Sequence, residues 1–127
     1  RPDYFVAGFE DGGIMHSSDN GITWIPSKNL AASTIYTFGS SIDGKDLYTG
    51  GWKTGLWRSE NAGVTWAQVW SDSSLEAIYS IFVDPRNAQH LMVGTVGNGI
   101  YESHDRGSTW RYAGLAGGQI KQIELYK

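Results

Sequence analysis

One short phrase occurs three times in this chain of 127 residues. It begins with serine, has Asp or Asn in third place and glycine in fifth, and closes on Thr-Trp. The copies are residues 17–24, 59–66 and 103–110, and their tryptophans lie 42 and then 44 residues apart. A fixed period in this range is typical of proteins built from stacked or radial repeats. We therefore predict that the chain consists of copies of one small structural unit.

The repetition extends beyond this phrase. The runs 6–8, 48–50 and 92–94 fall in the same register, as do the runs 13–15, 55–57 and 99–101. Each unit is predicted to contain four short strands, which in the third unit are 78–83, 91–95, 100–103 and 109–112, rich in β-branched and aromatic residues. No helix is predicted, because no helical periodicity follows the one stretch that resembles a capping box, 73–76.

The phrase itself predicts a tight turn between two strands. Its glycine adopts a positive φ without steric cost, and an Asp or Asn two residues earlier accepts hydrogen bonds from free backbone amides. The threonine re-enters a strand, and the tryptophan is a large apolar plug against the neighbouring sheet. Asn61 stands where the other copies have Asp and is expected to form the same turn. The predicted turn residues are Ser17, Asp19, Gly21, Thr23, Trp24, Ser59, Asn61, Gly63, Thr65, Trp66, Ser103, Asp105, Gly107, Thr109 and Trp110.

The pattern Ser-x-Asp-x-Gly-x-Thr-Trp resembles the Asp-box, or bacterial neuraminidase repeat, of sialidase-like, sortilin-like and photosystem-assembly-factor-like β-propellers. The resemblance implies an all-β fold of four-stranded antiparallel blades, with the phrase joining the third and fourth strands. It also favours a secreted or periplasmic location. It implies no activity, since these turns occur in enzymes and non-enzymes alike. The arginine triad of the sialidases does not map here, because Arg86 and Arg106 fall in turns on the wrong face.

The order of strands predicts a circularly permuted arrangement. If the phrase joins strands three and four, the chain opens without a first strand, and residues 120–125, which align with 78–83, supply a spare innermost strand at the other end. The whole chain, 1–127, is predicted to be a single partial β-propeller. Its three blades are residues 1–34 with 119–127, residues 35–77 and residues 78–118.

Three blades do not close a ring, since propellers have at least about four and open edges invite association. One solution is a head-to-tail homodimer, in which residues 120–125 of each copy complete the partner's first blade in a six-bladed ring. The other is that the remaining blades belong to a longer chain. Both predictions stay open at the level of sequence.

Composition excludes several classes of partner and cofactor. A net charge of −3 lacks the basic stripe that nucleic acid requires, and no apolar run approaches the length of a membrane span. The chain has no cysteine, and His16, His90 and His104 lack the spacing of a zinc site, so solvated histidines, no metal and no cofactor are expected. The glycine-rich run 94–99 is interpreted as a turn between strands rather than a dinucleotide loop.

Candidate ligand-binding residues come from the loops opposite the repeated turns, because loops on a rigid scaffold commonly carry function. Trp52 breaks the repeat and is either an exposed stacking surface or folded over its own hairpin. Tyr36, Tyr79 and Lys121 occupy matching places on the innermost strands, where they line a central channel or pack between blades. The candidates from the loops are Glu10, Asp11, Lys28, Asn29, Trp52, Lys53, Asp72, Glu76 and Asn98.

Convergent catalytic groups are harder to find. Glu10 and Asp11 are adjacent acids, whereas glycosidases hold two carboxylates about 5 to 9.5 Å apart on opposite sides of the sugar bond. A pairing of Asp11 with Asp72 or Glu76 of the next blade is the other possibility, which makes Asp11 and Asp72 the catalytic candidates. The sequence therefore favours a non-catalytic scaffold that binds a glycan or a peptide. The alternative is a sialidase-like or xyloglucanase-like glycoside hydrolase, or a fragment of one.

Overall fold

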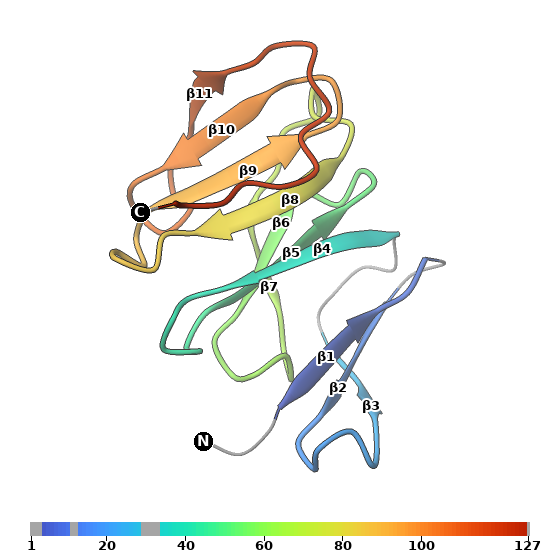
Figure 1. The fold of residues 1–127 in the computed structure, drawn as a ribbon. Helices are drawn as coiled ribbons and strands as arrows, with labels where there is room; N and C mark the ends of the chain where they lie inside the picture. The colour runs from blue at the N-terminus through green and yellow to red at the C-terminus, as the bar shows by residue number, and fades with distance from the viewer. Residues whose placement is uncertain (1–3, 11–12, 29–33, 127) are drawn as a thin grey trace.

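The computed structural model describes residues 4–10, 13–28 and 34–126. These residues form eleven β-strands and no helix, and the strands group into three antiparallel sheets (Figure 1). The prediction of an all-β fold is confirmed. No helix able to cross a bilayer is present in this part of the chain.

Each sheet is a meander of consecutive strands, and we call the sheets blades 1, 2 and 3. Blade 1 has three strands, β1 (Phe5–Gly8), β2 (Ile14–Ser17) and β3 (Ile25–Pro26). Blade 2 has four, β4 (Ile35–Ser40), β5 (Leu47–Gly51), β6 (Leu56–Ser59) and β7 (Ala67–Trp70). Blade 3 has β8 (Ile78–Val83), β9 (Leu91–Thr95), β10 (Ile100–Ser103) and β11 (Arg111–Gly114). Strands β8, β9 and β10 match the predicted ranges, and β11 begins later than predicted because Thr109 remains bonded within the turn.

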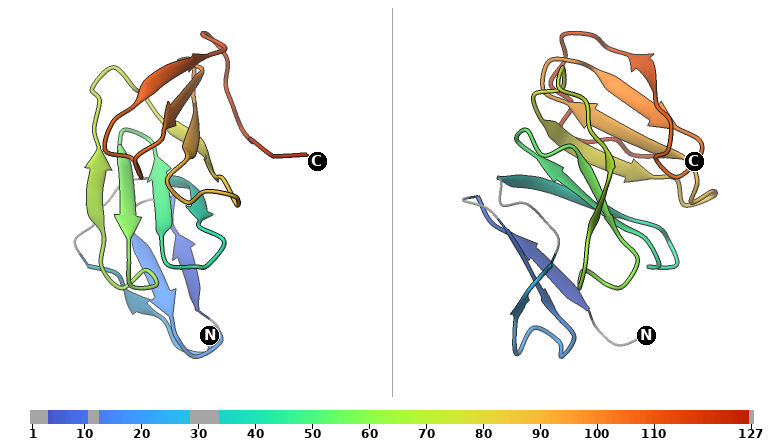
Figure 2. Two further views of the ribbon diagram at one scale, coloured as in Figure 1. Left: turned by 90° about the vertical axis from the view of Figure 1, so that its left-hand side faces the viewer. Right: turned by 180° about the vertical axis from the view of Figure 1, so that it is seen from behind.

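The blades stack face to face, so that β4 contacts both β1 and β8 (Figures 1 and 2). A glycine of β1 and a glycine of β5 each leave room for the isoleucine that opens the innermost strand of the next blade. A Cβ on Gly8 would lie 2.6 Å from Cγ2 of Ile35, and one on Gly50 would lie 2.9 Å from Cβ of Ile78. Glycine is required where another element approaches the backbone this closely, which explains why these glycines recur in register.

The main apolar core lies between blades 2 and 3. Tyr48, Leu56 and Ile78 are buried there, and the indole of Trp70 stacks on that of Trp110 with ring centroids 4.3 Å apart. Each such side chain removes a large apolar area from water, which is the chief favourable term in folding. The interface between blades is therefore a packed core rather than a hinge.

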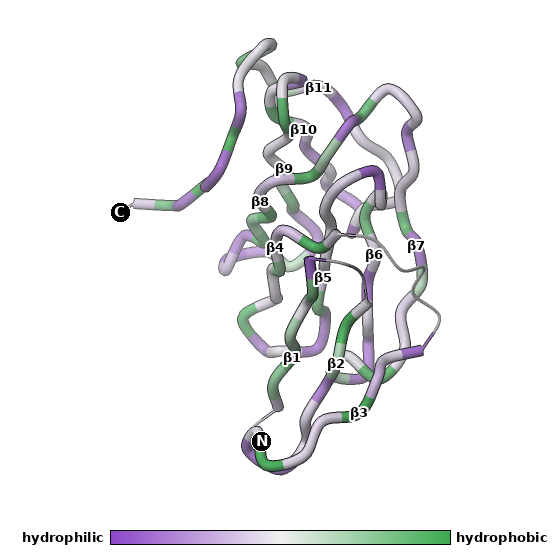
Figure 3. Tube along the Cα trace, turned by 90° about the vertical axis from the view of Figure 1, so that its right-hand side faces the viewer, coloured by the Kyte–Doolittle hydropathy of each residue, from purple (hydrophilic) through white to green (hydrophobic). Residues whose placement is uncertain are grey.

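The segment 120–125 was predicted to be a strand and is not one in the structure, where it pairs with no ladder. It nevertheless starts where the innermost strand of a further blade would start. The amide of Ile120 donates to the carbonyl of Thr95 at 2.9 Å, as the amide of Ile35 donates to Phe9 at 3.3 Å. A strand needs partner backbone groups, and no described sheet lies beyond blade 3 to supply them. Figures 2 and 3 show this segment projecting from the sheets, with hydrophobic and hydrophilic residues along it.

Candidate functional site

The repeated turns all use the same hydrogen bonds, with the serine at the centre. In the third copy the Ser103 hydroxyl accepts from the amide of Gly107 at 2.8 Å and donates to Oδ1 of Asp105 at 2.7 Å. The same Oδ1 accepts from the amide of Thr109 at 2.8 Å, and the indole N–H of Trp110 donates to the carbonyl of Gly107. These bonds satisfy the polar groups of a tight turn within the turn itself, so the turns are structural.

The copies differ at the acid. The carboxylate of Asp19 accepts hydrogen bonds from both the backbone amide and the hydroxyl of Thr23. The bond from the hydroxyl is the largest of the causes that lower the pKa of Asp19 to about 2. In the second copy the amide nitrogen of Asn61 instead donates to the hydroxyl of Thr65 at 2.8 Å. The geometry is retained, but the side chain at this position of the second copy is uncharged.

The residue before each turn glycine also has a positive φ, which the sequence did not predict. Asn20, Ala62 and Arg106 have φ of 69°, 61° and 59°. Left-handed geometry is uncommon for a residue with a Cβ and is tolerated best by Asn. Only the first of the three copies therefore carries the preferred residue here.

On the opposite face, three predicted ligand-binding residues line one open groove of about 430 Å³. They are Glu10 from the β1–β2 turn, Tyr36 from β4 and Trp52 from the β5–β6 turn, joined by Thr34. The Thr34 hydroxyl donates to the carbonyl of Glu10, and this contact ties the two blades together at the floor of the groove. Asp11, the neighbour of Glu10, lies outside the described residues.

Trp52 has a fixed backbone and a partly exposed side chain. Its amide donates to the carbonyl of Thr34 at 2.9 Å, and it forms an isolated antiparallel bridge with Ala77. The residue is 38% exposed, and the Nζ of Lys53 lies 5.6 Å from the ring centroid. Trp52 therefore lines the groove with an exposed side chain, and Lys53 of the same hairpin lies beside its ring.

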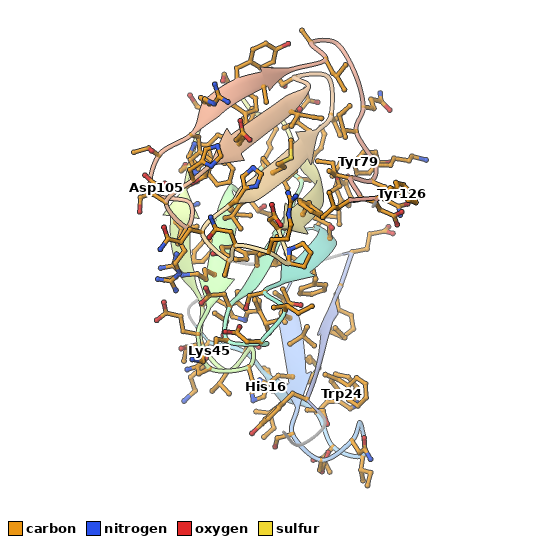
Figure 4. The ribbon with its side chains drawn as sticks, turned by 60° about the vertical axis from the view of Figure 1, so that its left-hand side comes forward. His16, Trp24, Lys45, Tyr79, Asp105 and Tyr126 are labelled. Carbon is orange, nitrogen blue, oxygen red and sulfur yellow. The ribbon has the colours of Figure 1, made fainter. Side chains whose placement is uncertain are left out.

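The predicted row on the innermost strands is continuous. The rings of Tyr36 and Tyr79 meet edge to face with centroids 5.6 Å apart, and Nζ of Lys121 lies 6.0 Å from the centroid of Tyr79. Figure 4 shows Tyr79 on the same side of the molecule as Tyr126 of the C-terminal segment. Since Tyr36 also lines the groove with Trp52, aromatic surface runs from the loop face onto the innermost strands of blades 2 and 3. We call Trp52, Tyr36, Tyr79 and Lys121 the aromatic row.

A second groove has a volume of about 590 Å³, and Lys53, Asp72 and Glu76 are among its lining residues. Asp72 accepts hydrogen bonds from the hydroxyl and the amide of Ser74, at 2.7 and 2.9 Å, and these bonds lower its pKa. An exposed carboxylate held in its ionised form is a poor proton donor. The position of Asp72 is therefore better explained by the turn than by catalysis.

Two of the remaining loop candidates lie elsewhere. Asn98 is in the β9–β10 turn, where its amide donates to the Thr95 hydroxyl, and it lines neither groove. Lys28 is wrongly placed by the prediction, since its backbone pairs with the repeated turn of blade 2 and so lies on the opposite face. Asn29 lies outside the described residues.

The expectation of three solvated histidines is wrong for two of them. His16 is buried and lies 3.3 Å from the hydroxyl of Ser27. His90 lies between two carboxylates, with Nδ1 2.9 Å from Oδ2 of Asp84 and Nε2 2.8 Å from Oε2 of Glu102. Burial opposes protonation of His90, but the two carboxylates outweigh it and raise its pKa.

His104 joins this cluster from the neighbouring turn. Its Nε2 lies 3.4 Å from the same oxygen of Glu102, and its ring stacks on that of His90 at 4.5 Å. No pattern in the sequence predicted the cluster, because residues 90 and 104 meet only through the pairing of β9 with β10.

Comparison with known proteins relates the chain to β-propellers. No model of a known protein family matches it. It is 30% identical over 107 residues to a curated xyloglucanase from a Paenibacillus species, an alignment that takes in 76% of this chain and 10% of that protein. The chain thus spans about a tenth of the length of this relative.

Solved structures agree on the fold. YCF48 bound to D1 peptide superimposes with a TM-score of 0.71 at 18% identity, over 87% of this chain and 37% of that one. The GH74 xyloglucanase from Xanthomonas campestris superimposes with a TM-score of 0.70 at 22% identity, over 91% of this chain and 22% of that one. The GH74 enzyme from Niastella koreensis superimposes with a TM-score of 0.69 at 24% identity, over 90% of this chain and 21% of that one. The chain therefore has the fold of part of a β-propeller.

Proposed function

We propose that this chain is a non-catalytic, ligand-binding part of an Asp-box propeller that holds an extended glycan on its loop face. The single observation that carries the proposal is the aromatic row, which joins the groove beside Trp52 to the innermost strands of blades 2 and 3. Flat aromatic rings bind the apolar face of a sugar with little loss of side-chain freedom. Hydroxyl groups of the sugar then meet Glu10 and the hydroxyl of Tyr36 at the rim.

A glycan is preferred to a peptide because the curated relative is a xyloglucanase. Peptide binding is the competing outcome, which the similarity to YCF48 bound to D1 peptide keeps in view. The xyloglucanase relative also favours the second candidate function, in which the chain is a segment of a glycoside hydrolase. The bonds that keep Asp72 ionised count against a role for that residue as the general acid.

The test is binding of xyloglucan and cello-oligosaccharides, measured by calorimetry and affinity electrophoresis. Trp52→Ala is expected to weaken glycan binding at least tenfold. Trp24→Ala is the matched control, since Trp24 is 39% exposed against 38% for Trp52 but belongs to a repeated turn at the other end of its sheet. Wild-type affinity in Trp52→Ala, or binding of peptides alone, would refute the glycan site. Release of reducing sugar would favour the hydrolase.

We further propose that the exposed edge of β1 takes an innermost strand of the kind found at 120–125. Phe5 and Phe9, at 46% and 43% exposed, flank this edge, and blade 1 has one strand fewer than its neighbours. The segment 120–125 has the complementary need, because it starts a further blade and pairs with no strand. Two copies would join head to tail in a six-bladed ring, or the missing blades lie in a longer chain.

Solution mass by light scattering separates these alternatives. If the ring forms, the wild type should have the mass of a dimer. Ile123→Pro should lower the mass to that of one chain, because proline removes a ladder donor. Gln122→Ala is the control and should remain a dimer. A monodisperse, folded monomer at high micromolar concentration would exclude the two-copy ring and leave the longer chain.

A further inference from the structure

We propose that His90, Glu102 and His104 form a binding site for a divalent zinc-type metal ion. The three side chains come from the residue before β9, from β10 and from the repeated turn that follows β10, at the end of blade 3 that carries this turn. One ligand atom from each lies within 4.8 Å of the other two. Two imidazoles and one carboxylate are a common set of protein ligands for Zn²⁺.

The distances are close to what the ion requires. Two ligand atoms on a tetrahedral Zn²⁺ lie about 3.3 Å apart, given bonds of about 2.0 to 2.1 Å. Oε2 of Glu102 lies 2.8 Å from Nε2 of His90 and 3.4 Å from Nε2 of His104. Insertion of an ion therefore needs shifts of the order of an ångström rather than a new arrangement of strands.

The other polar atoms of two ligands are already occupied, which leaves the ligand atoms to the ion. Nδ1 of His90 is held by the carboxylate of Asp84, so that Nε2 faces Glu102. Oε1 of Glu102 accepts two hydrogen bonds from Arg111, which leaves Oε2 toward the histidines. A carboxylate behind a ligating histidine is the usual way in which proteins orient that ring and strengthen it as a ligand.

His104 provides the adjustable ligand. Its side chain is 61% exposed and its ring lies parallel to that of His90, within 2°. Because it is exposed, it turns toward the ion at little cost in packing. Glu102 and His104 also line an open hollow of about 190 Å³, which gives room for water to complete the coordination.

Charge favours an ion of this type over a hard cation. Asp84 and Glu102 are each paired with an arginine, Arg86 and Arg111, so the cluster offers little net negative charge. Ca²⁺ and Mg²⁺ need several oxygen ligands, whereas Zn²⁺ binds imidazole nitrogen well. The ion takes the place of the hydrogen between Nε2 of His90 and Oε2 of Glu102, which leaves as a proton to water.

The test is titration of the chain with Zn²⁺ by calorimetry at pH 7.5 in a buffer that does not bind metals. We expect one ion per chain and affinity at least tenfold weaker in His104→Ala, a change that leaves the fold intact because the side chain is exposed. Asp84→Asn should weaken binding about tenfold at unchanged stoichiometry. His16→Gln is the control, since this buried histidine lies outside the cluster and should leave affinity unchanged.

Absence of binding by the wild type at millimolar Zn²⁺ would overturn the site. Equal affinity in His104→Ala and the wild type would do the same, because binding would then come from elsewhere on the chain. Thermal unfolding with and without Zn²⁺ gives a second readout, in which the ion should raise the melting temperature of the wild type but not of His104→Ala.

Discussion

The guanidinium of Arg106 holds the carboxylate of Asp46 with two hydrogen bonds, Nε to Oδ2 at 3.0 Å and a terminal nitrogen to Oδ1 at 2.8 Å. Arg106 stands in the third repeated turn, and Asp46 precedes β5 of blade 2. Glu60 accepts a further hydrogen bond from Arg106. The pKa of Arg106 is raised, first by its hydrogen bonds to Asp46 and then by the bond to Glu60. A variable position of the repeated phrase thus carries a clamp between blades.

Arg106→Ala is expected to lower the free energy of unfolding by about 2 kcal/mol, because it leaves the buried carboxylate of Asp46 without its cation. This expected loss is smaller than that for a fully buried ion pair because the Arg106 side chain is 38% exposed. Chemical denaturation measures the effect. Glu60→Ala is the control and should cost less than about 0.5 kcal/mol, since this partner is exposed. Equal losses in the two variants would contradict the clamp.

Substitutions at Asp105 should follow the example set by Asn61. Asp105→Asn is expected to retain most of the stability. In the second copy the side chain of Asn61 already accepts a hydrogen bond from the backbone amide of Thr65 and donates one to its hydroxyl. Asp105→Ala removes the acceptor for the Thr109 amide and should lose more. Midpoints of thermal unfolding of the two variants and the wild type give the order, and a reversed order would contradict it.

The same carboxylates predict sensitivity to acid. The pKa of Asp19 and that of Asp105 are each lowered to about 2 by bonds to threonine and serine. A carboxylate with a lowered pKa in the folded state stabilises the fold above its unfolded value, about 3.9. Stability should therefore fall as the pH drops from about 4 to about 2. Thermal melts between pH 6 and pH 2 test this, and the fall should be smaller in Asp105→Asn.

Gly94→Ala should release the C-terminal segment without unfolding the blades. A Cβ there would lie 2.2 Å from the hydroxyl of Ser80 and 2.6 Å from Cβ of Ile120, while the Ser80 hydroxyl donates to the Ile120 carbonyl at 2.7 Å. Faster hydrogen exchange over 118–126 is the expected result. Ser80→Ala is the companion variant and should loosen the same segment less. Unchanged exchange in Gly94→Ala would show that the segment is held elsewhere.

Tyr48→Phe is expected to be nearly neutral or slightly stabilising, within about 1 kcal/mol. Tyr48 is fully buried, and its hydroxyl makes no hydrogen bond of normal geometry among the described residues, although the side chain of Arg58 lies near it. Removing such a group removes a desolvation cost while the ring continues to fill the core. Equilibrium denaturation measures the difference. A loss above about 2 kcal/mol would mean that the hydroxyl has a partner in solution.

Local features were predictable from the chain. The turns and the strands of blade 3 depend on residues near one another in sequence, and the period of the repeat placed them. Glu10 and Trp52 were predicted only to share the loop face, and Tyr36 only to lie on an innermost strand, because the distances among them depend on how one blade packs on the next.

The repeat by itself determined that this protein is made of small antiparallel sheets, since turn chemistry and strand alternation act over a few residues. Tertiary structure alone decided which side chains meet across sheets. His90 reaches Glu102 through strand pairing, and Arg106 reaches Asp46 through the contact of two blades. Both contacts join residues at positions where the repeats differ, so no period in the sequence announces them.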